Sequence, residues 1–190
     1  MQPKTQYMER FIMQDLIAWK NREDRKPLIL LGARQVGKTY ILKEFGQREF
    51  ENVAYINCDN NAMAKDLFAS DYNIDRILLT IGAITGVNIE AGKTLIIMDE
   101  IQELHRGLAS LKYFCENARE YHVAVAGSLL GLSLHQGESY PVGKVNTLEM
   151  YPMTFEEFLW ARGFKQRMDL LQHGMWDVVK SLRTLYIQHL

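Results

Sequence analysis

An eight-residue stretch matches the spacing G-x-x-x-x-G-K-[ST] of a phosphate-binding loop at every fixed position, and its residues are Gly32, Ala33, Arg34, Gln35, Val36, Gly37, Lys38 and Thr39. A continuous apolar run, PLILLGA at 27–33, leads into it, and a helical pattern over 37–45 follows. Glycines let such a loop turn tightly and present backbone N–H groups to phosphate oxygens, and the helix N-terminus adds partial positive charge. We therefore predict that these residues, with the adjoining Tyr40, bind the phosphates of a nucleotide.

Three side chains of this loop carry specific expectations. Lys38 is expected to reach the β- and γ-phosphates, and Thr39 to bind a magnesium ion through its hydroxyl. Arg34 occupies a variable position of the motif. It either contacts phosphate or a neighbouring subunit, or it is a solvated loop residue, and the sequence leaves these alternatives open.

A second Gly-Lys-Thr, at 92–94, fails the same test. The first glycine of the motif would have to fall at Val87, and Gly86 lies one residue too early. This copy also precedes an apolar strand, whereas a phosphate loop follows a strand and opens a helix. We interpret it as a turn with a solvated Lys93.

The strand predicted after that turn ends in two adjacent carboxylates. Four apolar residues, 95–98, precede Asp99 and Glu100, which is the Walker B arrangement. Asp99 is expected to hold the magnesium ion, directly or through water, and Glu100 to polarise the attacking water. The alternative is an acidic helix cap, since Asp and Glu favour helix starts. The complete phosphate loop upstream favours Walker B, and the Asp-Glu pair indicates hydrolysis more than phosphoryl transfer to a small molecule.

Ser128 ends a further apolar run, HVAVAGS at 122–128. In ATPases with an extra strand between the phosphate loop and Walker B, a polar residue at this point senses the γ-phosphate or orients water. We predict that role for Ser128, and a simple turn serine is the alternative.

Other polar and aromatic residues give weaker signals. Arg106 and Lys144 are minor candidates for a charge that opposes the transferring phosphate. We expect ordinary core or surface roles for three histidines that lack metal or triad spacing: His105, His122 and His135. We expect a core-packing face for three aromatic residues at helical spacing: Phe155, Phe158 and Trp160.

Strand-like and helical patterns alternate along the chain. The strand-like runs span 27–33, 52–59, 94–100, 122–128 and 144–153. The helical patterns span 8–19, 37–45, 62–68, 74–84, 104–118 and 154–162, and helical character continues over 168–190. Thr154 and Glu157 form a capping-box pattern at the start of one of them. The alternation predicts an α/β fold with a mostly parallel sheet sandwiched by helices, which binds ligands at the carboxyl ends of its strands.

Composition sets outer limits on class and location. The 190 residues carry a net charge of −1. DNA is a possible partner, but this net charge does not support it. The two cysteines form no C-x-x-C pair, which argues against a zinc site. No apolar run has the length of a membrane span, and the N-terminus lacks the pattern of a signal peptide. We expect a cytoplasmic protein outside the membrane.

Five blocks together resemble one family. PLILLGARQVGKTYILKEF, YINCD, TLIIMDEIQE, AVAGSLLG and PVGKVNTLEMYPMTFEEFLWA are similar, in order and spacing, to the bacterial and archaeal AAA-like ATPases that carry a C-terminal domain of unknown function. The resemblance covers about Tyr7 to Arg162, and GARQVGKT and YPMTFEEFL are its specific parts. It implies a AAA-type P-loop NTPase module of the ASCE class with C-terminal helices. It also implies that ATP binds at 32–39, that Asp99 and Glu100 serve magnesium and water, and that Ser128 is the sensor serine.

The chain departs from the family's pattern at two positions. Leu129 follows the sensor, where a small or polar residue is usual, and Lys144 stands where the family often has arginine. Lysine lacks the planar geometry of arginine, which weakens the case for a catalytic Lys144. The family continues into a C-terminal domain resembling a nuclease fold. We therefore expect an N-terminal helix at 1–26, a P-loop ATPase core at 27–163, and at 164–190 the start of a missing lid or C-terminal region.

These observations predict a magnesium-dependent ATPase that binds ATP and ADP. Its hydrolysis would drive or signal to a partner, either an unidentified protein or the chain's own missing C-terminal domain, and a homo-oligomer is conceivable. The main alternative is a nucleotide-dependent switch with little turnover. A P-loop kinase is a third reading, which the Asp-Glu pair disfavours.

Overall fold

The computed structural model describes residues 9–59, 61–68, 71–104, 106–127 and 140–162. The chain divides into two compact units. The larger unit spans residues 12–152, and the smaller one contains the described residues 9–11 and 153–162. Among the described helices, none has the length and apolar character that crossing a bilayer requires.

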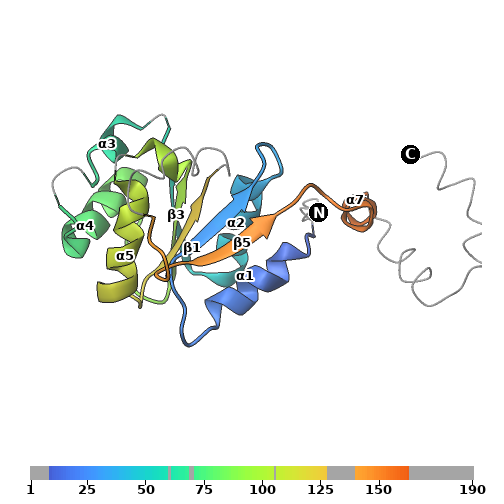
Figure 1. Ribbon diagram of the computed structural model, residues 1–190, viewed down its shortest axis with the longest axis horizontal. Helices are drawn as coiled ribbons and strands as arrows, with labels where there is room; N and C mark the ends of the chain where they lie inside the picture. Colours follow the sequence, from blue (N-terminus) through green and yellow to red (C-terminus); the bar gives the residue numbers. More distant parts are fainter. Residues whose placement is uncertain (1–8, 60, 69–70, 105, 128–139, 163–190) are drawn as a thin grey trace, which may run out of the picture. The chain divides into compact units, whose positions relative to one another are not determined.

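A parallel sheet forms the centre of the larger unit (Figure 1). Its five strands, in spatial order β2-β3-β4-β1-β5, are β1 (Leu28–Gly32), β2 (Asn52–Asn57), β3 (Thr94–Asp99), β4 (His122–Ala126) and β5 (Asn146–Met150). All neighbouring strands pair in parallel, so their carboxyl ends meet at one edge. β4 lies between β1 and β3. Each observed strand falls inside a predicted run, and the predicted α/β fold is confirmed.

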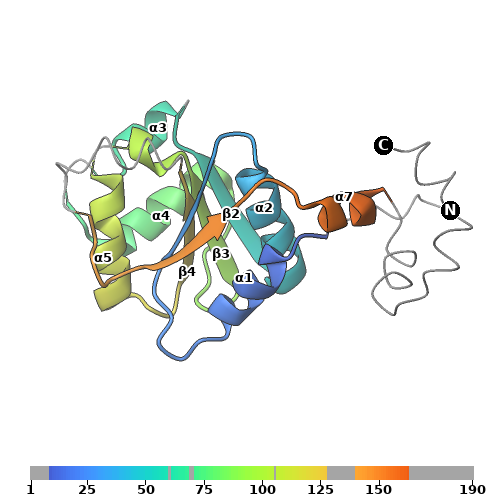
Figure 2. The same ribbon diagram turned by 45° about the vertical axis from the view of Figure 1, so that its right-hand side comes forward.

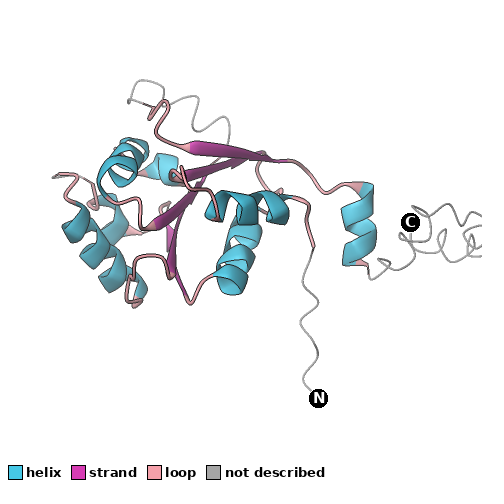
Figure 3. Ribbon diagram, turned by 90° about the horizontal axis from the view of Figure 1, so that it is seen from below, coloured by secondary structure: helices cyan, strands magenta, loops and turns pink. Residues whose placement is uncertain are grey.

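Helices cover both faces of this sheet, as Figures 2 and 3 show. One face packs against α1 (Ile12–Lys20) and α2 (Lys38–Glu49). The other face packs against α3 (Ala62–Lys65), α4 (Ile74–Thr85) and α5 (Gly107–Asn117). A short 3₁₀ turn, η1 (Ile101–Glu103), precedes α5, so the helix predicted from 104 begins three residues later.

The core consists of two apolar clusters separated by the sheet. Successive strand residues point to opposite faces, so Ile29 belongs to the cluster under α4 and α5, whereas Leu28 and Leu30 belong to the cluster under α1 and α2. Each of these side chains is fully buried. Burying a side chain of this size stabilises the fold by about 1.5–3 kcal/mol, which explains why the inner strands β1, β3 and β4 are largely continuous apolar runs in the sequence.

The smaller unit contains α7 (Phe155–Ala161), which begins with the predicted capping box. Glu157 lies buried, where it accepts hydrogen bonds from the backbone N–H groups of Thr154 and Phe11 and pairs with Arg10 at 3.0 Å. The prediction that the aromatic residues of this helix form a core face is wrong for Phe155 and Phe158, whose exposed fractions are 60% and 37%. The helix instead buries the face that carries Glu157 and Leu159.

His122 is a buried titratable residue at the start of β4. Its Nε2 lies 2.6 Å from Nη1 of Arg25, and the rings of Trp19 and Phe50 pack edge-on against it. Burial, reinforced by the positive charges of Arg25 and Lys20, lowers the pKa of His122 to about 4. Because Arg25 can only donate, the imidazole must be neutral to accept its hydrogen bond.

Stability should therefore fall in mild acid. The unfolded chain, with a histidine pKa of about 6.5, binds a proton that the folded chain excludes, so this contribution to stability is lost as the pH drops from about 6.5 towards 4. We predict that between pH 7 and pH 5 the wild type loses about 2 kcal/mol more unfolding free energy than His122→Gln, which keeps an acceptor for Arg25 but does not titrate. Urea denaturation at the two pH values measures this. Equal losses in both proteins would contradict the assignment.

Candidate phosphate-binding site

The loop between β1 and α2 is shaped by backbone conformations that favour glycine. Gly32 has φ +156° and Gly37 has φ +96°, and between them Gln35 adopts φ +65°. A Cβ atom at Gly32 would lie 2.3 Å from the carbonyl oxygen of Met150 on β5. The first glycine of the motif is therefore required by the close approach of the neighbouring strand. Gln35 and Gly37 are left-handed on either side of Val36, and mixed conformations of this kind can turn successive N–H groups towards one anion.

Lys38 begins α2 and is buried, with an exposed fraction of 7%. Its ammonium donates hydrogen bonds to the carbonyl oxygens of Gly32 at 3.0 Å and Ala33 at 2.7 Å. Burial lowers the pKa of Lys38; Glu100 and Asp99 oppose this shift, and Arg34 adds to it. No side chain caps the N-terminus of α2, so its partial positive charge is available to a ligand.

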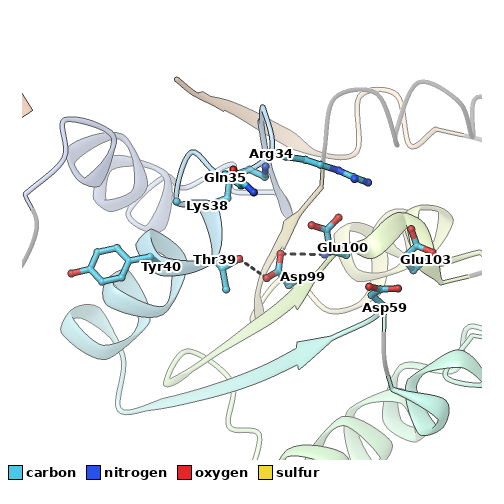
Figure 4. A pocket seen from close by; sticks show the side chains of 10 residues that line it. Arg34, Gln35, Lys38, Thr39, Tyr40, Asp59, Asp99, Glu100 and Glu103 are labelled. Carbon is cyan, nitrogen blue, oxygen red and sulfur yellow. Dashed lines mark hydrogen bonds between the residues drawn. The ribbon is translucent and has the colours of Figure 1, made fainter. Parts of the chain in front are cut away.

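Thr39 and Asp99 meet where α2 approaches the end of β3 (Figure 4). The Thr39 hydroxyl donates to Oδ2 of Asp99 at 2.6 Å, and the Tyr55 hydroxyl donates to the same oxygen at 3.2 Å. The backbone N–H of Glu100 donates to Oδ1 at 3.2 Å. Burial, followed by the charge and the hydrogen bond of Asp99, raises the pKa of Tyr55 to about 12, so this phenol is a donor at physiological pH.

Glu100 has an unusual backbone conformation. It adopts the left-handed region, with φ 53° and ψ 47°, as the residue that caps η1. Strain of this kind in a residue other than glycine is concentrated at functional sites. Its Oε2 accepts a hydrogen bond of 2.5 Å from Nε2 of Gln102, and the buried Oε1 of Gln102 has no hydrogen-bond partner among the described residues.

These side chains surround a pocket of about 540 Å³ at the carboxyl edge of the sheet. Its lining comprises Arg34, Gln35, Gly37, Lys38, Thr39, Tyr40, Asp59, Asp99, Glu100 and Glu103. Three residues of the motif have other surroundings. Gly32 and Ala33 offer their carbonyls to Lys38, and Val36 packs against the core cluster under α1 and α2.

Four residues of this region were not singled out from the sequence. Asp59 and Glu103 line the pocket, and Tyr55 and Gln102 hold its carboxylates. Gln102 stands two positions after Glu100 in the sequence DEIQE. This closeness was the only signal in the sequence that could have identified Gln102 as a partner of Glu100. Tyr55 could be recognised only from the pairing of β2 with β3, which opposes Tyr55 to Ile97 and Asn57 to Asp99.

The sequence also suggested candidates beyond the pocket lining. Ser128 and Leu129 fall outside the described residues, as do His105 and His135. Lys144 precedes β5, at the opposite end of the strand from the phosphate loop, and pairs with Glu116 at 2.8 Å. Arg106 donates to the Tyr72 hydroxyl at 3.0 Å.

The second Gly-Lys-Thr has the structure that its spacing predicts. Gly92 occupies a turn with φ +75°, and Thr94 begins β3. Lys93 is exposed and lies 3.5 Å from Glu51 and 3.4 Å from Glu90. This copy is a turn at the opposite end of β3 from Asp99.

The pocket's donor atoms suit a magnesium ion. Hydroxyl and carboxylate oxygens from Thr39 and Asp99 are the hard ligands that this ion prefers, and magnesium is commonly held by one or two carboxylates together with substrate phosphates. Within the ranges that the structure describes, no cluster of three or more His, Cys, Asp or Glu could hold a metal by itself.

A phosphate loop after β1, carboxylates at the end of β3 and a strand between them define a P-loop NTPase fold of the AAA type. The sequence profile of a family described as an AAA domain matches residues 24–159. The chain belongs to this family of AAA-type ATPases.

Comparisons with individual proteins add less. No curated protein matches the chain. Among solved structures, it is similar to the Orc1 protein of Aeropyrum pernix, determined in complex with DNA, with 14% sequence identity and a TM-score of 0.48. The match covers 81% of this chain and 47% of that one, so the chain spans about half the length of the Orc1 protein.

The Gly32 contact can be tested by adding a single methyl group. We predict that Gly32→Ala lowers the unfolding free energy by about 2 kcal/mol more than Gly92→Ala. Both residues have positive φ, +156° at Gly32 and +75° at Gly92, but a Cβ at Gly92 meets nothing within 4 Å, so that variant shows the effect of a Cβ at a positive-φ glycine without a steric contact. Chemical denaturation measures the difference. Equal destabilisation would show that the approach of Met150 does not require glycine.

Proposed function

We propose that this pocket binds ATP with magnesium and that the chain hydrolyses it. The observation that carries the proposal is the 2.6 Å hydrogen bond between Thr39 and Asp99, because it joins the end of a phosphate loop to the carboxylate of a separate strand. A glycine-dependent loop, an uncapped helix N-terminus and a buried lysine beside this pair supply what a triphosphate needs.

The binding step is an exchange of partners by Lys38. Its ammonium now bonds to two loop carbonyls, and a bound triphosphate would offer its β- and γ-oxygens in their place. Thr39 and Asp99 would hold the magnesium ion, which supplies charge neutralisation at the phosphates.

The hydrolytic step is assigned to Glu100. Its carboxylate would accept a proton from a water molecule as the water oxygen bonds to the γ-phosphorus. The bond from that phosphorus to the bridging oxygen breaks, which releases ADP and inorganic phosphate. The left-handed backbone conformation of Glu100 places its carboxylate in the pocket lining for this role. Ser128 remains the candidate sensor of the γ-phosphate.

A switch with little turnover is the second candidate. One observation favours it: an oxygen of the Glu100 carboxylate is already engaged by Gln102, in a hydrogen bond of 2.5 Å. If that bond persists with nucleotide bound, Glu100 has less freedom to meet water. A kinase has no comparable support, since the adjacent Asp-Glu pair is typical of hydrolysis.

The nucleotide state would be passed to a partner. We propose either another protein or a C-terminal domain of the same polypeptide, with assembly of several copies as a further option. A net charge of −1 gives no support to DNA as the ligand.

Nucleotide binding is tested by comparing the two Gly-Lys-Thr lysines. We predict that Lys38→Ala weakens ATP binding roughly 10- to 100-fold, because a charge-assisted contact to phosphate is lost. Lys93→Ala should leave the affinity unchanged, since this lysine is exposed in a turn. Isothermal titration with magnesium and ATP measures both. An unchanged affinity in Lys38→Ala would refute the phosphate-loop assignment.

Hydrolysis is tested at Glu100. We predict that Glu100→Gln lowers the rate of phosphate release about 10²- to 10⁴-fold while ATP still binds, because the amide cannot accept the proton. Single-turnover phosphate release, run beside an ATP titration, separates the two effects. Tight ATP binding without measurable release in the wild type would instead favour the switch.

A further inference from the structure

Tyr55 lies next to the candidate metal-binding carboxylate although it belongs to a different strand. β2 pairs with β3 so that Tyr55 opposes Ile97 and Asn57 opposes Asp99. Alternate residues of a strand share a face, so the side chains of Tyr55 and Asp99 lie on the same face of the sheet. That face is covered by α2, which begins next to Thr39. In the strand order β2-β3-β4-β1, Tyr55 on β2 lies on one side of β3, and β1, which leads into the phosphate loop, lies on the other side. The phenol therefore approaches the Asp99 carboxylate from the side opposite to β1.

Three donors from three parts of the chain fix the Asp99 carboxylate. Oδ2 accepts from the hydroxyls of Thr39 and Tyr55, and Oδ1 accepts from the Glu100 N–H. Two of these donors have other duties in the proposed function: Thr39 is a candidate metal ligand, and Glu100 the candidate base. The Tyr55 hydroxyl has no other role in the proposed function, so its hydrogen bond serves to orient the Asp99 carboxylate.

The Tyr55 ring is itself held in place. The ammonium of Lys43 lies 3.4 Å from the ring centroid. Lys43 is one helical turn after Thr39 on α2, so the helix that places the Thr39 hydroxyl also clamps the ring. A phenol is rigid beyond its two side-chain torsions, so a fixed ring fixes the position of its hydroxyl.

We propose that Tyr55 is a positioning residue that sets the Asp99 carboxylate for the metal ion. The proposal rests on the proposed function, because it presumes that magnesium binds beside Asp99 together with the nucleotide. Its specific content is that the tyrosine hydroxyl lowers the magnesium concentration needed for nucleotide binding. A tyrosine that only filled space would affect stability and leave that concentration unchanged.

The test is Tyr55→Phe, which removes one oxygen and keeps the ring. Binding of a fluorescent, ribose-labelled ATP is titrated with magnesium, and separately measured in EDTA. We expect the magnesium midpoint to rise about 3- to 10-fold, the size expected for the loss of one ordinary hydrogen bond, while binding in EDTA is unchanged. Tyr113→Phe, on α5, is the matched control and should retain the wild-type midpoint.

A second measurement shows whether Tyr55 acts through Asp99. In an Asp99→Asn background, Tyr55→Phe should produce no further change in the magnesium midpoint. If Tyr55→Phe does not fold, Lys43→Met replaces it; that variant releases the ring clamp and should raise the midpoint in the same direction.

The outcomes separate the two levels of the proposal. Wild-type protein that fails to bind the labelled ATP at any magnesium concentration would overturn the proposed function. Wild-type protein that binds with a clear magnesium midpoint, matched by folded Tyr55→Phe, would overturn the role of Tyr55 alone. A shift of equal size in the Asp99→Asn background would also overturn it.

Discussion

The hydrogen bond from Thr39 to Asp99 joins two segments 60 residues apart, and the rest of the site depends on it. The phosphate loop follows β1, whereas Asp99 ends β3, and β4 separates the two strands. The bond can form only because α2 starts at the carboxyl edge of the sheet and packs across its face. Ile41, Leu42 and Phe45 are fully buried in the cluster that also contains residues of β3 and β4. Apolar packing thus sets the position of a polar contact.

Charge in the pocket imposes a second condition. Four carboxylates line it (Asp59, Asp99, Glu100 and Glu103), against two basic side chains (Arg34 and Lys38), so the lining as described is net negative by two charges. A bare triphosphate would meet repulsion from this set at short range. A divalent cation beside Asp99 would remove much of that repulsion, so the proposed nucleotide and metal would be interdependent ligands. The acidic lining therefore gives an electrostatic reason to expect the proposed nucleotide binding to require magnesium.

The sequence was most informative where structure is local. The glycine spacing of the loop, the apolar strands and the capping box at Thr154 each depend on residues close together in the chain, and each was predicted. Tyr55 was missed because its role depends on the register between β2 and β3, which no local pattern specifies. The exposure of Phe158 was also missed, because helical spacing identifies a face without showing which face is covered. The roles of the site residues remain predictions.

The bonds of Lys38 to its own loop have a consequence for ligand selection. Because two of the three ammonium donors already bond to carbonyls, an anion that displaces these carbonyls gains only the difference between its own bonds and those it replaces. A single phosphate or sulfate ion would make few contacts beyond those exchanged, so its net gain in binding free energy would be small. A chain of phosphates that also contacts the N-terminus of α2 and a metal ion beside Asp99 would form more bonds and would therefore bind more tightly. If the loop binds nucleotide as proposed, this exchange would make it favour longer phosphate chains over single phosphate or sulfate ions.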